Sequence, residues 1–253
     1  MKKDLVSIII PYFKKKKYFL KSFNSAYQQI YKKKEILIVY DDPDLSDLSF
    51  IKKIIKNKKN VYLYVNNKNH GVGPSRNLAI KKSNGEFLAF IDSDDIWKKQ
   101  KLNKQIEFMK KNKLAASFTS YSIINSSGKI IDFRPAKKKI TFKDLIFSCD
   151  IGLSTVILKK QKKIINKIKF PNLKTKEDYV LWLNLSKNKI IFYGLKNNLT
   201  QWRKLDNSLS SNLIQKLLDG FKVYKIYLKF NTFKSIWYLF LLSKNYITKS
   251  YLN

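Results

Sequence analysis

Half of the acidic residues in this lysine-rich chain fall into three short clusters. The chain has 18 aspartates and glutamates against 52 lysines and arginines. Four of the acids lie in residues 41–47, three in residues 92–95, and two form the pair Glu177 and Asp178. Carboxylates that gather in a basic background are typical of a site that binds a metal ion or moves a proton. The fold therefore has to bring some of these clusters together.

The middle cluster directly follows an apolar run. The segment FLAFIDSDDIW places Asp92, Asp94 and Asp95 after residues 86–91. A divalent cation needs hard oxygen ligands and open positions for substrate phosphates, and an Asp-x-Asp at a strand end provides both. A solvated turn or a helix cap formed by Asp94 or Asp95 is the structural alternative. Aspartyl-phosphate phosphatases also carry an Asp-x-Asp after a strand, so a metal-dependent phosphatase is an enzymatic alternative.

Apolar runs alternate with segments of helical spacing in the first half of the chain. The predicted strands are residues 4–10, 35–40, 61–65 and 86–91, and the predicted helices are residues 18–29, 48–55 and 75–82. Strands that are apolar throughout indicate an α/β fold whose parallel sheet is covered on both faces. Ligands bind such sheets beside the carboxyl ends of the strands. We therefore expect the polar loops 41–47, 66–74 and 92–95 to converge on one crevice.

The second half of the chain is less regular. We predict strands over residues 115–124, 129–133, 155–158, 190–193 and 199–203. A helix over residues 177–185 begins with the acidic pair, and two further helical segments occupy residues 213–230 and 233–246.

The composition excludes several classes of site. Cys149 and His70 are the only cysteine and histidine, which excludes a disulfide framework, a cysteine zinc site and any site that needs two histidines. No apolar run is long enough to span a bilayer, and the N-terminal run ends at Pro11, too early for a signal peptide. We therefore expect a cytoplasmic protein.

The formal net charge of +34 raises a rival from a different class. Such a balance favours nucleic acid or an anionic membrane as a partner, so a basic non-catalytic binding protein is the alternative to an enzyme. However, 49 of the 52 basic residues are lysines spread along the chain. A nucleic-acid binder would be expected to use arginine for bidentate contacts. The alternative also leaves the acidic clusters unexplained, and we expect no nucleic-acid partner.

Six motifs in a fixed order resemble the family 2 glycosyltransferases with a GT-A fold, a Rossmann-like α/β fold. They cover roughly residues 4–211 and read VSIIIPYF, IVYDDPDLSD, GVGPSRNLAI, GEFLAFIDSDDIW, KEDYVLWLNL and QWRKLDNSLS. The resemblance implies an inverting enzyme that moves a sugar from a nucleotide diphosphate, expected to be UDP, to an acceptor hydroxyl. It also implies Mn²⁺ or Mg²⁺ as cofactor. The implied acceptor is a saccharide or lipid-linked saccharide of bacterial surface polysaccharide biosynthesis.

The resemblance also implies roles for residues on the nucleotide side. Pro11 and Phe13 lie near the base, with Phe13 where the family usually has a tyrosine. Asp41 accepts a hydrogen bond from the base, Asp42 supports its loop, and Pro43 replaces a common glycine.

Arg76 and the middle acidic cluster complete the implied donor site. Arg76 lies near the nucleotide and the acidic loops. Asp92 and Asp94 belong to the nucleotide site, and Asp94 and Asp95 hold the ribose and the metal ion.

Two later motifs supply the acceptor side and the diphosphate flap. In the first, Asp178 is the implied general base and Glu177 its acidic neighbour; Trp182 is either a platform for the acceptor sugar or a core residue. A helix N-terminus should keep Asp178 ionised. In the second, Arg203 and Ser208 lie near the diphosphate, and Leu205 replaces a common histidine.

These assignments divide the chain into three parts. Residues 1–113 form the nucleotide-sugar-binding half, residues 114–211 the acceptor-binding half of the same domain, and residues 212–253 a basic amphipathic helical tail. The tail either contacts an anionic membrane at the inner face of the plasma membrane or packs on the catalytic domain. Its predicted apolar face consists of Ile214, Leu217, Leu218, Phe221, Tyr224 and Leu228.

Overall fold

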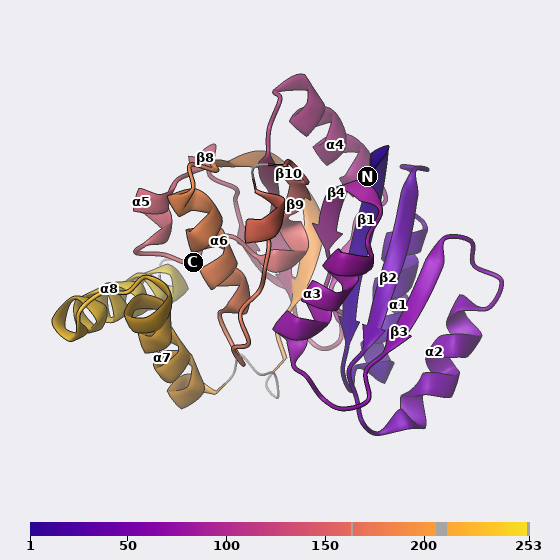
Figure 1. Cartoon of the computed structure of the whole chain (residues 1–253), viewed down its shortest axis with the longest axis horizontal. Helices are drawn as coiled ribbons and strands as arrows, with labels where there is room; N and C mark the ends of the chain where they lie inside the picture. The colour runs from indigo at the N-terminus through magenta and orange to yellow at the C-terminus, as the bar shows by residue number, and fades with distance from the viewer. Residues whose placement is uncertain (163, 206–211, 252–253) are drawn as a thin grey trace.

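A single curled sheet forms the centre of the molecule (Figure 1) in the computed structural model, which describes residues 1–162, 164–205 and 212–251. Its strand order is β3-β2-β1-β4-β9-β6-β10-β5, with β7 beside β6 and β8 beside β10. The strands are β1 (Lys2–Tyr12), β2 (Lys34–Tyr40), β3 (Val61–Val65), β4 (Gly85–Phe90), β5 (Ile96–Trp97), β6 (Ala116–Ile124), β7 (Ile130–Arg134), β8 (Lys139–Ile140), β9 (Ile157–Lys159) and β10 (Phe192–Arg203).

Most of these strands share one direction. β1 pairs parallel with β2 and β4, and β2 pairs parallel with β3. β9 runs antiparallel to both β4 and β6, and β10 pairs parallel with β6, so β6 and β10 point the same way as the first four strands. The predicted mostly parallel sheet is therefore confirmed, and the predicted strand boundaries in the first half hold to within a few residues.

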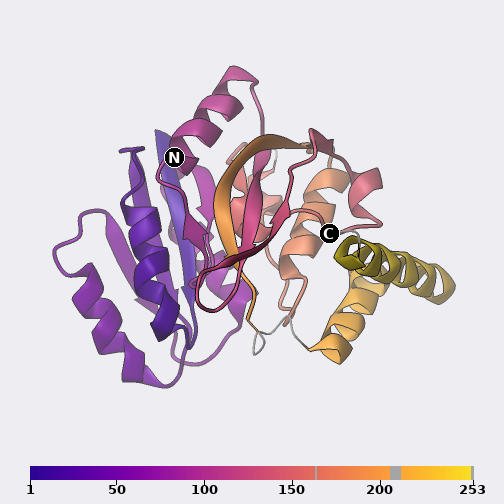
Figure 2. The same cartoon turned by 180° about the vertical axis from the view of Figure 1, so that it is seen from behind.

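Helices cover both faces of the sheet because the strands are apolar on both sides. In β1, Ile9 packs on the side of α3 and α6, whereas Ile8 and Ile10 pack on the side of α1, α2 and α4. Figure 1 shows α3 and α6 on one face of the sheet, and Figure 2, seen from behind, shows α1 on the opposite face. The bounds are α1 (Lys16–Tyr27), α2 (Leu48–Ile55), α3 (Val72–Lys82), α4 (Lys101–Lys111), α5 (Phe142–Leu145) and α6 (Glu177–Lys187).

β10 differs from the sequence prediction. The two strands predicted at residues 190–193 and 199–203 are one long strand, which shifts register against β6 between Leu195 and Thr200. Such bulges bend a strand and increase its twist. The bent strand begins beside β8 and ends beside β5, which follows the acidic segment 92–95 directly. Its last residue, Arg203, therefore reaches that segment.

The tail folds back on the domain. It consists of α7 (Leu213–Lys222), the π-helical turn η5 (Val223–Tyr227) and α8 (Thr232–Tyr251). The predicted apolar face is split: Tyr224 and Leu228 are buried in the core, whereas Ile214, Leu217 and Leu218 are exposed. The tail is thus anchored by its middle and leaves part of its apolar surface in solvent. Within the described residues, no helix is long and apolar enough to cross a membrane. The predicted division of the chain at residues 113 and 211 stays a prediction.

Candidate active site

Arg76 joins two of the acidic clusters. From the first half of α3, its Nη2 donates to Asp92 Oδ1 at 2.7 Å and its Nη1 to Glu177 Oε1 at 2.5 Å. The side chain is buried and lies over the ring of Phe170. Burial alone would lower the pKa of Arg76, but Asp92 and Glu177 together raise it above its ordinary value. A permanent buried cation therefore connects the loop after β4 to the start of α6.

Asp95 is held by the protein on both oxygens. Its Oδ2 accepts from Ser154 Oγ at 2.5 Å, and its Oδ1 accepts from the backbone N–H of Arg203 at 2.8 Å. Its side chain is almost inaccessible to solvent. Burial, with Asp94 and Asp92 close by, raises the pKa of Asp95 well above its usual value. This carboxylate therefore ties β10 to the acidic loop. The predicted metal role of Asp95 stays a prediction.

Asp94 lies in the same acidic loop and pairs with a lysine. It is half-buried, and its Oδ2 pairs with Lys15 Nζ at 2.9 Å, so a positive charge already lies against it. Burial raises the pKa of Asp94, Lys15 lowers it, and Asp92 raises it further. This crowding of carboxylates is the charge that a divalent cation relieves, and one or two carboxylates suffice when phosphates supply further ligands. Over the described part of the chain there is no cluster of three acidic, histidine or cysteine side chains that could hold a metal without substrate.

Asp41 anchors the loop that follows β3. One of its oxygens accepts from Asn66 Nδ2 at 2.6 Å and from the N–H of His70 at 2.9 Å, and the other from the N–H of Gly71 at 2.8 Å. The loops 41–47, 66–74 and 92–95 thus meet at the carboxyl ends of β2, β3 and β4, as predicted. Phe13 is partly exposed just after β1. The predicted contacts of Asp41 and Phe13 with a base stay predictions.

Pro11 lies inside β1, next to the strand end that leads to Phe13. It is buried and pairs in register with Val39 of β2. Its contact with a nucleotide also stays a prediction.

Asp178 lies in the first turn of α6, beside Glu177. The residue before the pair, Lys176, has a left-handed backbone conformation with φ of 62°. Such strain in a non-glycine residue is common at functional sites. Asp178 is half-buried. Burial and the neighbouring Glu177 raise the pKa of Asp178 to about 7, against the opposing effect of Arg76. The helix N-terminus is expected to favour the ionised carboxylate, but desolvation has the larger effect on the pKa of Asp178.

Trp182 is a core residue. It is fully buried, and its ring packs edge-on against Phe90, Phe170 and Phe192. α6 is covered on this side by the sheet, so Trp182 cannot stack on an acceptor sugar, and the predicted platform is wrong.

Arg203 lies beside the acidic loop but is heavily engaged. Its Nε donates to the carbonyl of Asp94 at 2.9 Å, and its Nη1 donates to the carbonyl of Asn125 at 2.8 Å. The guanidinium also lies 4.7 Å over the ring of Tyr18. Ser208 lies outside the described residues, and the diphosphate roles of both residues stay predictions.

Sequence reasoning missed Ser154. Its Oγ accepts from the N–H of Asp92 at 3.0 Å while donating to Asp95, so one hydroxyl holds both ends of the Asp-x-Asp-Asp loop. Ser154 lies in the short 3₁₀ helix η2 (Leu153–Thr155), 62 residues from Asp92. A serine between two apolar segments gives no local signal of such a contact. Lys15, the partner of Asp94, was missed for the same reason in a chain full of lysines.

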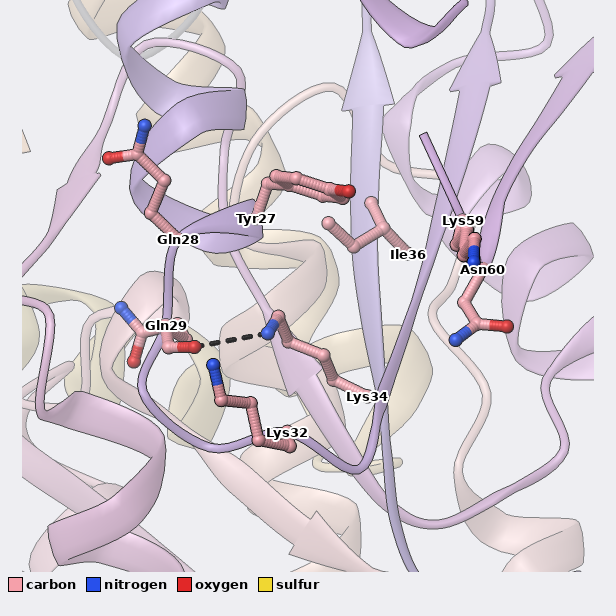
Figure 3. Close-up of a pocket in the computed structure, with 8 residues that line it drawn as sticks. All are labelled: Tyr27, Gln28, Gln29, Lys32, Lys34, Ile36, Lys59 and Asn60. Atoms are coloured by element: carbon pink, nitrogen blue, oxygen red, sulfur yellow. Dashed lines mark hydrogen bonds between the residues drawn. The ribbon is translucent and has the colours of Figure 1, made fainter. Parts of the chain in front are cut away.

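One surface cavity lies away from these acids. It has a volume of about 290 Å³ and is lined by residues around the start of β2 (Figure 3). There, Lys34 Nζ donates to the carbonyl of Gln29 at 3.0 Å. The start of β2 is the opposite end of the parallel sheet from the acidic loops. A second cavity, of about 260 Å³, adjoins Arg203 and Tyr18.

Comparison with known proteins identifies related glycosyltransferases. The profile of glycosyl transferase family 2 matches residues 7–171. The chain is 31% identical over 248 residues to a Bacillus subtilis protein named for teichuronic acid biosynthesis, the glycosyltransferase TuaG, and covers 98% of each chain. It is 36% identical over 214 residues to the Escherichia coli UDP-Glc:alpha-D-GlcNAc-diphosphoundecaprenol beta-1,3-glucosyltransferase WfgD, covering 84% of this chain and 82% of that one.

Solved structures show the same fold. Staphylococcus aureus TarS residues 1–349, in complex with UDP-GlcNAc, superposes with a TM-score of 0.73 at 22% identity, covering 93% of this chain and 70% of that one. The mannosyltransferase PcManGT of Pyrobaculum calidifontis, in complex with GDP-Man and Mn²⁺, superposes with a TM-score of 0.68 at 11% identity, covering 92% of this chain and 69% of that one. These likenesses confirm the predicted GT-A fold.

The chain belongs to glycosyl transferase family 2, because the family profile covers more than half of it and relatives above 30% identity match nearly its whole length. It is therefore a glycosyltransferase, and the phosphatase and the non-catalytic binding protein are set aside. The predicted absence of a nucleic-acid partner stays a prediction.

Proposed function

We propose that the protein is an inverting glycosyltransferase that moves a sugar from UDP to an acceptor hydroxyl, with Asp178 as the general base. The observation that carries this proposal is the Arg76 bridge, which fixes the acidic pair of α6 against the loop after β4. A base with a pKa near 7 can accept a proton and still be ionised at neutral pH. The alternative carboxylates, Asp41 and Asp95, each hold other parts of the chain through hydrogen bonds on both oxygens.

The reaction is a single displacement. The acceptor oxygen attacks the anomeric carbon from the face opposite the nucleotide and forms the new glycosidic bond while its proton passes to Asp178. The bond from the anomeric carbon to the diphosphate oxygen breaks, and the electron pair leaves with UDP. Arg76 stays charged throughout and holds Glu177 and Asp92 in place, so the base is preorganised toward the donor.

Asp94, with Asp92 beside it, would hold the Mn²⁺ or Mg²⁺ expected for the donor. When bound, the cation supplies positive charge to the diphosphate of the leaving group. Phe13 and Asp41 would face the base, and Arg203 and Ser208 the diphosphate.

The acceptor is proposed to be a saccharide or lipid-linked saccharide of bacterial surface polysaccharide biosynthesis. This proposal is supported by the names of the relatives, one of which acts on a sugar linked to diphosphoundecaprenol. The enzyme would work in the cytoplasm, at the inner face of the plasma membrane.

A ligand screen tests the donor. The thermal unfolding midpoint is measured with UDP-glucose, UDP-N-acetylglucosamine and GDP-mannose, each with and without manganese. We expect a UDP-sugar to raise the midpoint only when manganese is present, because binding to the folded state stabilises it. A larger shift with GDP-mannose would exclude UDP as the nucleotide.

A further inference from the structure

Helix α8 turns a row of large apolar side chains away from the rest of the molecule. Phe233 is 87% exposed and Trp237 59% exposed, whereas Ser235 and Leu242 on the opposite side are buried. The spacing of three and four residues places the exposed side chains on one face. This lipid face, as we name it, consists of Phe233, Ile236, Trp237, Phe240 and Ile247, all more than half exposed.

α7 packs beside α8 and adds a second exposed apolar surface. A Cβ at Gly220 would lie only 2.7 Å from Cδ1 of Leu239, so the two helices approach each other closely at this glycine. Lys216 Nζ lies 5.4 Å over the ring of Tyr246, which fixes the other end of the pair. Figures 1 and 2 both show the two helices together at one end of the molecule. The exposed apolar residues of α7 are Leu213, Ile214, Leu217 and Leu218.

The charges of the tail indicate which kind of partner its exposed surface fits. Residues 212–253 contain seven lysines and one acid, Asp219. Asp219 is buried and accepts from both the N–H and the Oγ1 of Thr175, each at 3.0 Å. The described tail therefore presents apolar and basic groups to solvent, with its acid turned inward. A second copy of the chain would bring like charge against like charge, whereas an anionic lipid surface complements both features.

We propose that the lipid face of α8 docks on an anionic phospholipid surface, with aromatic side chains inserted at the headgroup level and lysines around them. The docking also orients the active site. Asp219 in α7 accepts two hydrogen bonds from Thr175, which lies two residues before Glu177. The tail is therefore attached to the segment that leads into the acidic pair. This second step rests on the proposed function; the lipid contact itself does not.

Vesicle sedimentation tests the contact in the full-length protein without any nucleotide sugar. The probes are vesicles of phosphatidylglycerol and of phosphatidylcholine. The variant Trp237→Ser with Phe240→Ser removes the centre of the lipid face. The matched control, Ile130→Ser with Phe133→Ser, removes two side chains of β7 that are 54% and 43% exposed.

We expect wild type and control to bind phosphatidylglycerol vesicles, and the tail variant to bind them about tenfold or more weakly. The proposal is overturned if the tail variant binds phosphatidylglycerol vesicles as well as wild type does, or if wild type binds phosphatidylcholine vesicles equally well. It is also overturned if wild type is a dimer and the tail variant is not. Because Trp237 is exposed, the variant should fold; the more exposed Phe233→Ser is tested in parallel. Sugar transfer to a water-soluble acceptor is measured separately. If the wild-type protein shows no transfer, the proposed function is refuted, but the lipid contact is not.

Discussion

The guanidinium of Arg76 lies 2.5 Å from the carboxylate of Glu177, although 101 residues separate them in the sequence. The same guanidinium donates to Asp92. One buried cation therefore fixes the distance between Asp92, in the loop after β4, and the acids that begin α6. In the proposed mechanism, this distance sets whether Asp178 faces the donor sugar.

Replacing Arg76 should destabilise the fold strongly. In Arg76→Ala, Glu177 is left buried without its partner, which typically costs about 3–5 kcal/mol. The control is Arg134→Ala, which breaks a partly exposed pair with Asp132 and should cost less than about 1 kcal/mol. Urea unfolding gives both free energies. Similar values for the two variants would show that the bridge does not hold the site together.

Asp94 and Asp95 should behave differently on substitution. Asp94→Asn should weaken manganese-dependent UDP binding by about tenfold or more, with little change in stability, since its carboxylate is partly exposed and pairs only with the side chain of Lys15 among the described ion pairs. Asp95→Asn should instead cost about 1–3 kcal/mol of unfolding free energy, because an amide cannot accept from both Ser154 and Arg203. Calorimetric titration with UDP and urea unfolding separate the two effects. If Asp95→Asn weakens manganese-dependent UDP binding and Asp94→Asn does not, Asp95 is the metal ligand.

The order of the motifs predicted that the polar loops converge, whereas long-range contacts determine which of their side chains stay accessible. The clusters at residues 41–47 and 92–95 follow strands of one parallel sheet, so their convergence could be predicted from strand order alone. The saturation of Asp95 could not, because its partners Ser154 and Arg203 are 59 and 108 residues away. Trp182 was ambiguous for a similar reason: its side of α6 is buried only because Phe170 and Phe192 pack there.

Ser154 should contribute as much to the free energy of unfolding as the acids that it contacts. Ser154→Ala leaves the buried Asp95 with one partner and the N–H of Asp92 with none among the described contacts, at a cost of about 1–3 kcal/mol. Ser154→Thr keeps the hydroxyl and should recover most of the loss. Ser127→Ala, which removes an exposed hydroxyl bonded to Asn125, should change stability by less than about 0.5 kcal/mol. Unfolding free energies that do not separate Ser154→Ala from Ser127→Ala would refute the role.

The pKa of Asp178 predicts opposite pH trends for activity and stability. Activity needs the ionised base, so kcat/KM should rise with pH up to about 7 and then level off. The folded state holds the Asp178 proton more tightly than the unfolded state, where the pKa is near 3.8. This group therefore makes the free energy of unfolding fall as pH rises between these values. Asp178→Asn should make that fall smaller, whereas Asp94 and Asp95, whose pKa values are also raised, still contribute to it. Urea unfolding at pH 5 and pH 8 measures the difference, and an unchanged difference would contradict the assignment.

The configuration of the product tests the central claim most directly. With the UDP-sugar found by the ligand screen, NMR of the product reports the configuration at the anomeric carbon. A single displacement assisted by Asp178 predicts inversion, so an α-linked donor gives a β-linked product. Asp178→Asn should form the same product about 10²–10⁴ times more slowly with nearly unchanged UDP-sugar affinity. A product with retained configuration, or full transfer activity in Asp178→Asn, would contradict the mechanism.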